Sequence, residues 1–546
     1  MQRRNISGSR TITAGRLRAT FAGKVLLVCL GLFSLAAHAS CDGTDPVPGL
    51  KTSYAEGWGI DHRNTRFQPA SAIDASNASG LTLKWVYGLS STTPRAYSLI
   101  TEDTIFVGDG GRGLVALDRE TGCERWVHEH KGAIASAIPR GRIGDRDILI
   151  FNDRTQGLYA VDARDGSLIG HAVVDDEPVP WYSGTPLVTG DTVLLPVASL
   201  EVGLAANPFY GCCTTSGGMA AFDISTGKKR WYLPTIEAEA QVTGSHFFGF
   251  VQKYGPSGAA VWGAPSYDAK RDWLFFGTGQ NFTHPTTDTS DAIFAVEAKT
   301  GKIVWVHQYT ANDAYTAACN IKALNHPNCA EPTGPDVDFG APTMLLHTSS
   351  GRELLIGGQK SADVHAMDPE TGTPVWTTKL GRGGIIGGVH WGMAANESLG
   401  LLYVPISDKE VKGFPAPGTP TPGLYALDVE TGEKRWRYTR ESRCAEEECV
   451  FGLSSAIIAA NDIVVTGSID GYLEVMAADT GKLLWSHDAW RDYSAVNGIE
   501  TKGGAFDAHG PMLADDLLVV TSGYGYVGRQ RAGNALLVFQ VEAKSE

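Results

Sequence analysis

Along this chain, short runs in which apolar and polar residues alternate lead repeatedly into the same turn. In its most regular form the phrase reads Ala-x-Asp-x-x-Thr-Gly-x-x-x-Trp, as in ALDVETGEKRW. It occurs seven times, at Ala116–Trp126, Ala160–Gly170, Ala221–Trp231, Ala295–Trp305, Ala366–Trp376, Ala426–Trp436 and Val475–Trp485. Only the second copy lacks the closing tryptophan.

Each copy of the phrase predicts a β-hairpin. An alternation with a period of two residues is typical of a strand with one buried face. In the turn, Asp and Thr oxygens bond to nearby backbone and Gly supplies a positive φ. A second strand leaves the turn and ends at the tryptophan, and we expect that ring to pack on the neighbouring unit.

Two more strand-like runs, such as DTIFVG and DWLFFG, precede most copies. Each unit therefore has about four strands, as in a propeller blade. The chain ends complement each other: Leu81–Gly88 is a Trp-bearing strand with no turn before it, and Ala535–Val541 is a strand with no Trp after it. We predict an all-β fold, an eight-bladed β-propeller with four-stranded antiparallel blades, closed by pairing of these N- and C-terminal strands. An open solenoid is the alternative, and it would need capping repeats.

The first 39 residues predict a secretory signal peptide. Residues 1–24 carry six basic and no acidic residues, the apolar run VLLVCLGLFSLAA follows, and Ala37–Ala39 offers a small-residue cleavage site. The run is short for a membrane span, which needs about 20 residues, although a membrane anchor is the alternative. We predict a periplasmic protein without stable membrane insertion, in which residues 40–546 form a single propeller domain.

Composition and charge narrow the possible partners. The chain has 546 residues, of which 43% are hydrophobic, enough to bury a large core. Its formal charge is −14, and loss of the six basic residues of the leader would make it −20. An acidic surface argues against nucleic acid and anionic membranes as partners, and it suits an exported protein that docks with a basic one.

Eight cysteines remain once Cys29 leaves with the leader, an even number that suggests disulfides in an oxidising compartment. The candidate pairs are Cys212–Cys213, Cys319–Cys329, Cys444–Cys449 and, by default, Cys41–Cys123. Consecutive Cα atoms lie about 3.8 Å apart, below the usual disulfide span of about 4.4–6.8 Å, so a bridge between neighbours would be strained. Two small buried hydrophobes on opposite faces of a strand are the alternative. The sequence contains no CxxCH, CxxC or HExxH and so predicts no attached c-type haem and no zinc site.

Six further phrases carry aromatic or ionisable residues. They are PVASLEVG with Glu201, AAVWGAPSYD with Trp262, FFGTGQN with Gln280 and Asn281, GPDVDFGAP with Asp338, GGQKSADVHAMD with Lys360, and GGVHWGMA with His390 and Trp391. Together with the repeat and the adjacent cysteines they resemble the quinoprotein alcohol dehydrogenases. Members of that family bind pyrroloquinoline quinone (PQQ) and Ca²⁺ or a lanthanide in the central funnel of a propeller. The resemblance runs from about Trp58 to Phe539 and is nearest to the polyvinyl-alcohol-dehydrogenase-type branch, without a haem c domain.

The resemblance implies how PQQ is held. PQQ is flat and polyanionic, and the resemblance assigns the large aromatic face that stacks on it to Trp262. On the opposite face it places Cys212 and Cys213 as a disulfide that forms a rigid lid. Lys360 would bond to the quinone oxygens and stabilise developing negative charge. His390 and Trp391 would reach the same funnel, and for His390 a core histidine is an equal alternative.

The resemblance also implies a metal and a base. Ca²⁺ would act as a Lewis acid on the quinone C5 carbonyl. Hard cations prefer oxygen ligands, and Glu201, Gln280 or Asn281, and Asp338 match the family positions. Asp338 would take the alcohol proton, because a carboxylate can be held ionised beside a cation. Asp313, in YTANDAY, is the alternative base.

Two departures from the family pattern concern the metal. The chain has TGQN where the family usually has TGN, so the amide ligand is a longer Gln280 or a shifted Asn281. Gly340, two residues after Asp338, replaces the extra Asp of lanthanide-using relatives. The second departure favours calcium.

A third departure concerns the PQQ carboxylates. In the segment GAIASAI, Ala135 stands where the family often has an arginine that grips a carboxylate. Arg140 and Arg95 are the nearest substitutes. Loss of the cofactor site is the alternative.

The sequence thus predicts a PQQ- and Ca²⁺-dependent dehydrogenase that oxidises an alcohol, secondary or polymeric on the model of its nearest branch. Hydride would pass to PQQ, and the electrons would pass to a separate acceptor such as a soluble cytochrome c. The alternative from another class is a non-catalytic propeller scaffold of the cell envelope, which would bind no cofactor. A hydrolase ranks last, because no GxSxG-like nucleophile site is present.

Overall fold

The computed structural model describes residues 47, 50, 54–92, 94–134, 136–321, 326–410, 416–508, 510–525 and 530–541. The predicted signal peptide lies outside these ranges, so the boundary between residues 39 and 40 stays a prediction. The described helices are α1 (Glu201–Leu204) and the 3-10 turns η1 (Ala78–Gly80), η2 (Ala317–Asn320) and η3 (Glu447–Cys449). None of these described helices has the length and apolar character needed to cross a membrane.

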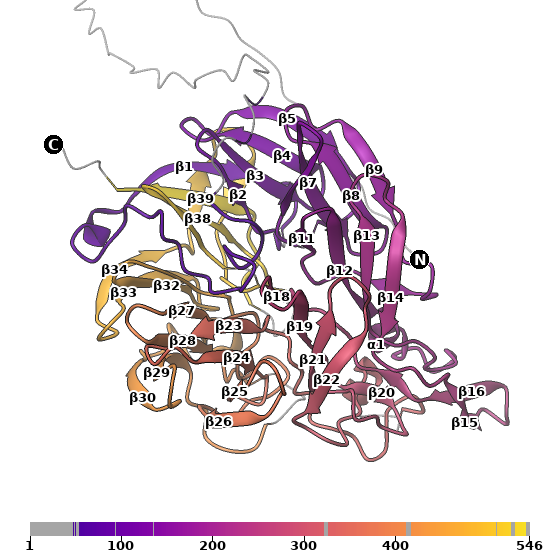
Figure 1. Cartoon of the computed structure of the whole chain (residues 1–546). Helices are drawn as coiled ribbons and strands as arrows, with labels where there is room; N and C mark the ends of the chain where they lie inside the picture. Colours follow the sequence, from indigo (N-terminus) through magenta and orange to yellow (C-terminus); the bar gives the residue numbers. More distant parts are fainter. Residues whose placement is uncertain are drawn as a thin grey trace, which may run out of the picture. The chain divides into compact units, whose positions relative to one another are not determined.

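Eight antiparallel sheets of four or five strands form the blades of a propeller (Figure 1). Blades 1 to 4 contain β2 (Leu99–Ile100), β3 (Thr104–Asp109), β4 (Gly113–Asp118) and β5 (Glu124–Glu129); β6 (Arg140–Ile143), β7 (Arg146–Asp153), β8 (Gly157–Asp162) and β9 (Leu168–Ala172); β10 (Pro180–Trp181), β11 (Leu187–Thr189), β12 (Thr192–Ser199), β13 (Gly218–Asp223) and β14 (Lys229–Pro234); and β18 (Ser266–Asp268), β19 (Trp273–Gly277), β21 (Ala292–Glu297) and β22 (Ile303–Gln308). Blades 5 to 7 contain β23 (Met344–His347), β24 (Glu353–Gly358), β25 (Asp363–Met367) and β26 (Pro374–Lys379); β27 (Ala394–Asn396), β28 (Leu401–Ile406), β29 (Gly423–Asp428) and β30 (Lys434–Tyr438); and β31 (Ile458–Ala460), β32 (Ile463–Gly467), β33 (Tyr472–Ala477) and β34 (Leu483–Asp488). Three two-stranded antiparallel ribbons lie in the described loops between the blade strands: β15 (Gln241–His246) with β16 (Val251–Gly255), β17 (Ser257–Gly258) with β20 (Asn281–Thr283), and β35 (Asp492–Ser494) with β36 (Glu500–Lys502).

The eighth blade joins the two ends of the described chain. Its strand order is β1 (Thr82–Gly88), β39 (Ala535–Gln540), β38 (Leu517–Ser522) and β37 (Met512–Ala514). β1 and β39 run antiparallel, from the pair Thr82 and Gln540 to the pair Gly88 and Ala535. The predicted eight-bladed propeller and its closure by the terminal strands are therefore confirmed, and the open solenoid is excluded.

In five of the seven hairpins the closing tryptophan bonds to the next blade; the second hairpin has no tryptophan, and the Trp126 ring packs on the Gly166 turn but its Nε1 has no hydrogen-bond partner among the described residues. In those five, the indole N–H donates to a backbone carbonyl of the next blade, as Trp376 Nε1 does to Val429 O at 3.1 Å. The tryptophans that make this contact are Trp85, Trp231, Trp305, Trp376, Trp436 and Trp485. Trp485 makes it across the ring closure, to Leu81 O at 3.1 Å. These tryptophans thus link most pairs of neighbouring blades by a half-buried aromatic ring.

The turn glycine beneath such a ring cannot carry a side chain. A Cβ on Gly432 would lie 2.6 Å from the ring of Trp376. The φ of Gly432 is +73°, a left-handed conformation that residues with a side chain rarely adopt. Gly227 is a matched control: its φ is +66°, but the hairpin of the preceding blade ends without a tryptophan, and a Cβ there would meet nothing closer than His171 O at 3.9 Å. We expect Gly432→Ala to lower the free energy of unfolding by about 1–3 kcal/mol more than Gly227→Ala does. Urea denaturation of the two variants measures the difference, and equal losses would contradict this packing.

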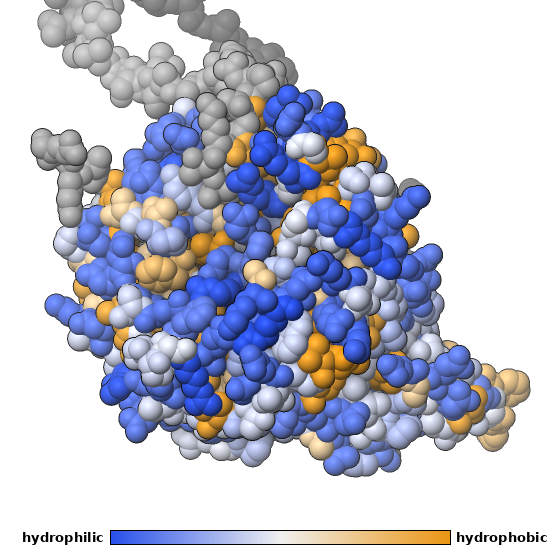
Figure 2. All heavy atoms as spheres, in the orientation of Figure 1, coloured by the Kyte–Doolittle hydropathy of each residue, from blue (hydrophilic) through white to orange (hydrophobic). Residues whose placement is uncertain are grey.

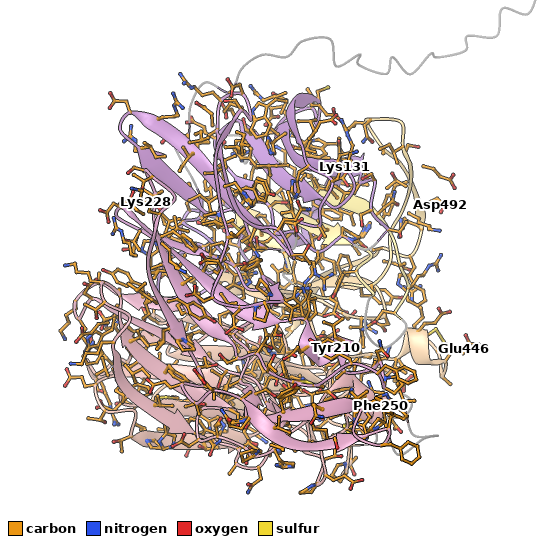
Figure 3. The ribbon with its side chains drawn as sticks, turned by 90° about the vertical axis from the view of Figure 1, so that its right-hand side faces the viewer. Lys131, Tyr210, Lys228, Phe250, Glu446 and Asp492 are labelled. Atoms are coloured by element: carbon orange, nitrogen blue, oxygen red, sulfur yellow. A yellow bond between two sulfur atoms is a disulfide. The ribbon has the colours of Figure 1, made fainter. Side chains whose placement is uncertain are left out.

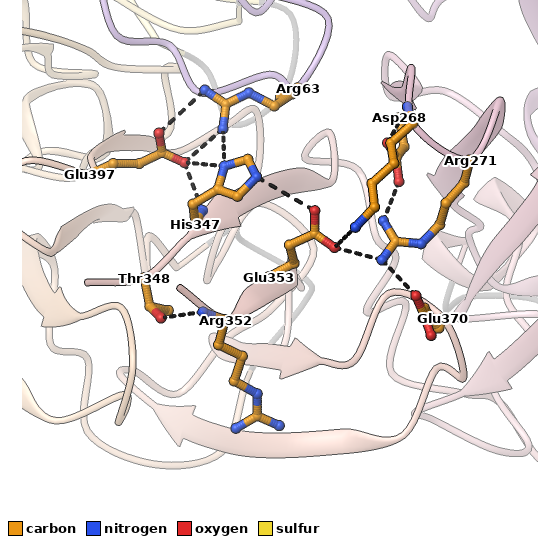
Figure 4. Close-up of polar contacts among 10 residues, drawn as sticks. Arg63, Asp268, Arg271, His347, Thr348, Arg352, Glu353, Glu370 and Glu397 are labelled. Atoms are coloured by element: carbon orange, nitrogen blue, oxygen red, sulfur yellow. Dashed lines mark hydrogen bonds and ion pairs between the residues drawn. The ribbon is translucent and has the colours of Figure 1, made fainter. Parts of the chain in front are cut away.

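An ion-pair network links blades 4, 5 and 6 (Figure 4). Arg271 Nη2 lies 2.5 Å from Glu353 Oε2 and 3.0 Å from Glu370 Oε1. Arg63, from the segment that precedes the first blade, pairs with Glu397 at 2.7 Å between Nη1 and Oε1. Such partly exposed pairs are each worth about 0–1 kcal/mol, so the network fixes the register of the blades more than it stabilises them.

The disulfides agree with the predicted pairs. Cys212–Cys213, Cys319–Cys329 and Cys444–Cys449 are bonded. Cys123 is also disulfide-bonded, while Cys41, its expected partner, lies outside the described residues. The alternative of two unbonded hydrophobic side chains at residues 212 and 213 is therefore wrong.

Candidate active site

A cavity of about 570 Å³ lies where loops from blades 1 to 6 and 8 meet. These loops lie at one end of the blades, so their side chains converge on the propeller axis. The contributing residues include Arg95 before β2, Trp181 on β10, Trp262 before β18, Lys360 after β24, Trp391 before β27 and Asp507 before β37. Because blades from opposite sides of the ring contribute, the cavity is central and not a gap between two neighbours.

The structure brings most of the predicted site residues to this cavity. Its lining includes Trp262, Gln280, Asp338, Lys360, His390 and Trp391. Four other predicted residues are buried and do not line it, namely Glu201, Asn281, Cys212 and Cys213. Cys212 and Cys213 pack in one apolar cluster with Ala260 and Phe282, which do line the cavity. The disulfide therefore lies directly behind the wall.

Trp262 is held rigidly by its neighbours. His390 and Trp391 contact its ring edge-on, with ring centroids 5.9 Å and 5.5 Å away. Gly340 packs so closely that a Cβ built there would overlap the six-membered ring of Trp262. The family resemblance related Gly340 to the preference for calcium over a lanthanide. In the structure Gly340 also leaves room for the Trp262 ring.

Gly340→Ala tests the predicted PQQ site at Trp262: we expect it to displace the ring and to weaken binding of PQQ at least tenfold. Adding a methyl group to a tightly packed site costs about 1–3 kcal/mol, and here the ring must move. Gly170→Ala is the control, because a Cβ there would meet nothing within 4 Å. The measurement is a PQQ titration followed by quenching of tryptophan fluorescence, with a thermal melt of each variant. Unchanged PQQ affinity in Gly340→Ala would contradict the supporting role.

A buried lysine lies between two carboxylates at the cavity. Lys360 Nζ lies 2.7 Å from Asp336 Oδ1 and 3.0 Å from Asp338 Oδ2. Burial opposes the charge on Lys360, but the two carboxylates outweigh it and raise the pKa of the ammonium group. Asp338 Oδ1 also accepts a hydrogen bond from the backbone N–H of Gln280 at 2.9 Å. Lys360 therefore stays a charged hydrogen-bond donor at neutral pH, and both oxygens of Asp338 are fixed in position.

Asp313, the alternative base, lies behind the loop that carries this pair. Its carboxylate accepts from the backbone N–H groups of Asp336 at 3.1 Å and Val337 at 2.9 Å. It does not line the cavity, and burial raises its pKa to about 6. Of the two candidate bases, Asp338 therefore faces the cavity, and Asp313 supports the loop behind it.

Glu201 secures the loop that contains the adjacent cysteines. It begins α1, and its Oε2 accepts from the backbone N–H groups of Thr214 and Thr215, both at 2.8 Å, and from Thr215 Oγ1 at 2.6 Å. Its Oε1 accepts from the hydroxyl of Tyr210 at 2.9 Å. The carboxylate that the sequence comparison assigned to the metal is thus fully engaged in binding its own loop.

The two candidate amide ligands point in different directions. Gln280 lines the cavity, and its Nε2 donates to Tyr315 O at 3.2 Å, which leaves Oε1 as the acceptor oxygen of the group. Asn281 is turned into the protein: its Nδ2 donates to Ser257 O at 3.1 Å and its Oδ1 accepts from the Thr287 N–H at 2.9 Å. Of the two amides, Gln280 is the one placed to bind a metal in the cavity.

Arg95 is placed to bind an anion in the cavity. It is 8% exposed, its guanidinium lies 4.6 Å from the Trp391 ring centroid, and within the described ranges its Nε has no hydrogen-bond partner. Arg140 instead lies on β6 and faces Asp147, 3.8 Å away. Ala135 itself lies outside the described residues. Of the two arginines that the sequence offered as substitutes, Arg95 is the one at the cavity.

His390 serves the cavity as a neutral ring. Burial lowers its pKa well below the usual value, and the charges of Lys360 and Arg95 add to that effect. Its Nδ1 shares a hydrogen bond of 2.7 Å with Ser454 Oγ. His390 is therefore both a satisfied buried histidine and a part of the cavity wall.

The sequence analysis missed three charged residues of the lining, Asp336, Arg154 and Asp507. The sequence could have indicated Asp336 as a site residue, because it precedes Asp338 by two residues in the same phrase. Arg154, whose guanidinium lies 4.8 Å from the Trp181 ring centroid, and Asp507 had no such signal. Only the closure of the ring brings these residues beside the others.

Two family models match the chain. Residues 56–320 match "Glucose/ethanol/alcohol dehydrogenase, beta-propeller domain", and residues 332–536 match "Outer membrane protein assembly factor BamB". The crystal structure of quinohemoprotein alcohol dehydrogenase from Comamonas testosteroni superposes with a TM-score of 0.64 at 17% identity, over 91% of this chain and 82% of that one. That likeness shows the fold.

Two curated relatives define the family more closely. The polyvinylalcohol dehydrogenase of Sphingopyxis sp. (strain 113P3) is 32% identical over 507 residues, which cover 89% of this chain and 76% of that protein. The polyvinylalcohol dehydrogenase of a Pseudomonas sp. is 31% identical over 523 residues, which cover 92% of this chain and 80% of that protein. The chain belongs to the PQQ-dependent (quinoprotein) alcohol dehydrogenases, among relatives named polyvinylalcohol dehydrogenases. It is therefore an oxidoreductase, and the envelope-scaffold alternative is wrong.

Proposed function

We propose that this protein is a periplasmic, PQQ- and Ca²⁺-dependent dehydrogenase that oxidises a secondary or polymeric alcohol and passes the electrons to an external cytochrome c. The convergence of Trp262, Lys360 and Asp338 on one central cavity carries the proposal. The names of the two relatives at 32% and 31% identity support a polymeric alcohol.

The chemistry of the cavity wall fits PQQ. Trp262 offers an aromatic surface for a flat tricycle. Arg95, Arg154 and Lys360 give the lining three cations, which suit the carboxylates of a polyanion. The unpartnered Nε of Arg95 is a buried donor that such a carboxylate would satisfy. Arg95 would thus bind the PQQ carboxylate that an arginine at position 135 often binds in the family.

In the proposed reaction, bound PQQ supplies an acceptor for the hydride that leaves the carbinol carbon. Asp338 takes the hydroxyl proton on a carboxylate oxygen, because it lines the cavity and the Gln280 N–H and Lys360 fix both of its oxygens. Lys360 Nζ donates to oxygen that gains negative charge, and it stays protonated because Asp336 and Asp338 raise its pKa. Asp336 balances the charge of Lys360 while Asp338 takes part in proton transfer.

Calcium fits the oxygen atoms of the same wall. Gln280 and Asp338 both line the cavity and offer the oxygen ligands that Ca²⁺ prefers. Glu201 can join them only if it releases a donor, because Tyr210 and the backbone of Thr214 and Thr215 already engage its oxygens. When bound, the metal would polarise a carbonyl as a Lewis acid.

The proposed location and electron acceptor follow from the leader and the charge. Cleavage after residue 39 would leave residues 40–546 as a single propeller domain in the periplasm, where the disulfides are stable. Without the leader the formal charge is −20, which suits docking to a basic cytochrome c.

The test is a PQQ titration of the purified mature protein with and without Ca²⁺, followed by dye reduction with a panel of primary, secondary and polymeric alcohols. The proposal predicts saturable activity that requires both PQQ and Ca²⁺ and is highest with secondary or polymeric alcohols. PQQ-dependent activity that is indifferent to Ca²⁺, or confined to primary alcohols, would overturn the metal or the substrate class respectively.

A further inference from the structure

A two-stranded arm carries apolar side chains into solvent. β15 and β16 extend away from the ring, and the end of the arm is hydrophobic (Figures 1 and 2). Phe248 is 103% exposed and Phe250 is 88% exposed. We define the aromatic arm as the exposed residues Phe209, Val242, Phe247, Phe248 and Phe250. These five side chains are all apolar, and they lie on an acidic protein in which β16 also carries Lys253.

The aromatic arm is ordered. β15 and β16 pair along their length, from Gln241 opposite Gly255 to His246 opposite Val251. The rings of Phe209 and Phe247 stack with centroids 4.9 Å apart and planes 24° apart. His246 Nε2 bonds to Pro208 O at 2.8 Å. A preorganised surface of this kind binds a partner with little further loss of conformational entropy.

The arm is continuous with the wall of the cavity. At its base, the backbone N–H of Tyr254 donates to Cys212 O at 2.8 Å. Phe209 follows the cavity-lining Gly203 by six residues, so it lies within about 20 Å of the wall along the chain. Figure 3 shows Tyr210 and Phe250 on the same side of the molecule. A long molecule held by the arm can therefore place another part of itself in the cavity.

We propose that the aromatic arm binds the carbon backbone of an uncharged polymeric alcohol and keeps the chain beside the cavity while its hydroxyl groups are oxidised. The proposal rests on the proposed function, because it names the polymer as the substrate class of that cavity. Exposed aromatic rings offer large apolar area at low entropic cost, and methylene groups of a carbon chain pack on them. A patch of this kind on a soluble protein marks an interaction site.

The surroundings of the arm favour a neutral polymer over a membrane or a second copy. Arms that insert into anionic lipid carry clusters of Lys and Arg beside their aromatic residues. Here Lys253 is the basic residue of β16, and Glu237 and Glu239 precede β15. Two copies of a chain with a formal charge of −14 also repel each other. A neutral polymer meets neither obstacle.

The test compares polymeric and small alcohols in the PQQ-loaded protein. The variant is Phe248→Ser with Phe250→Ser, and the control is Leu168→Ser, which changes an exposed apolar residue on β9 (56% exposed). With polyvinyl alcohol as substrate, we expect the double variant to raise KM at least tenfold at unchanged kcat. With 2,4-pentanediol, kcat/KM should stay within twofold of wild type. Equal effects on both substrates, or no effect on polyvinyl alcohol, would overturn the proposal.

A second measurement needs neither PQQ nor turnover, so it separates this proposal from the proposed function. PQQ-free protein is passed over immobilised polyvinyl alcohol, and we expect wild type and Leu168→Ser to be retained and the double variant to elute early. Early elution of the wild type would overturn the proposal even if the enzyme is active. If the double variant instead loses binding to phosphatidylethanolamine–phosphatidylglycerol vesicles, or loses self-association in sedimentation, with polymer retention intact, the arm serves a membrane or a second copy and the proposal is wrong.

Discussion

Asp338→Asn is expected to lower kcat by about 10²–10⁴-fold while PQQ still binds. A positioned general base contributes about that factor, and the amide cannot accept the alcohol proton. Asn has nearly the same shape, so the Gln280 N–H can still donate to its oxygen, as it does to Asp338 Oδ1 at 2.9 Å. The measurement is dye-linked kcat at saturating PQQ and Ca²⁺, with PQQ affinity determined separately by fluorescence quenching.

Asp313→Asn is the matched control for the base. Asp313 lies behind the loop and bonds to the backbone of Asp336 and Val337, so its replacement should cost stability more than turnover. We expect kcat to fall by less than about tenfold, below the range of a lost general base. The opposite pattern, with Asp338→Asn fully active and Asp313→Asn inactive, would move the base to Asp313.

Lys360→Met is expected to lower the free energy of unfolding by about 3–5 kcal/mol, because it leaves two buried carboxylates without their cation. Lys360 is 4% exposed, and Asp336 and Asp338 are each 5% exposed. Burial raises the pKa of Asp336 to about 7 even with Lys360 opposing the shift. An unfolded Asp has a pKa of about 3.9, so the folded state binds this proton more tightly and stability falls as pH rises from 4 through 7. The loss in Lys360→Met should therefore be larger at pH 8 than at pH 5.

Adding Asp336→Asn to Lys360→Met tests the cause of that loss. The second change removes one of the uncompensated charges, so the double variant should recover part of the stability at pH 8 and little at pH 5. Dye-linked activity should stay low in both variants, since the donor to the cofactor is absent. Urea denaturation at both pH values provides the comparison, and a Lys360→Met variant as stable as wild type would show that the buried pair does not form.

The repeated hairpins made the fold predictable. A period of two, a turn with Asp, Thr and Gly, and a closing tryptophan are local signals, and their regular spacing implies blades. Closure of the ring was also predictable, because β1 carries a tryptophan with no turn before it and β39 is a strand with no tryptophan after it. The paired strands β15 and β16 were not foreseen, since they interrupt the repeat and their apolar residues do not face a core.

Site residues could be predicted where a sequence phrase marks a single residue. They were harder to predict where the site depends on contacts between blades. Trp262, Lys360 and Asp338 lie at the cavity as expected. The metal role of Glu201 stays a prediction; its carboxylate engages the cysteine loop, because Thr214 and Thr215 present their N–H groups to it. Those bonds depend on a loop conformation that no spacing rule gives.

For Arg95 and Gly340, too, the sequence left open a role that only the three-dimensional structure shows. The sequence offered Arg95 and Arg140 equally, and only the arrangement of Trp391 and Asp147 distinguishes them. For Gly340 the sequence showed the absence of a carboxylate. The packing of Trp262 on that glycine needs the three-dimensional structure.

The most direct test of the central claim is a calorimetric titration of PQQ into the apo protein in Ca²⁺, for wild type and Trp262→Leu. The account predicts saturable binding of one PQQ per chain to the wild type and affinity at least tenfold weaker for the variant, since the stacking face is gone. No heat of binding to the wild type, or equal affinity in Trp262→Leu, would contradict the assignment of the central cavity as the PQQ site.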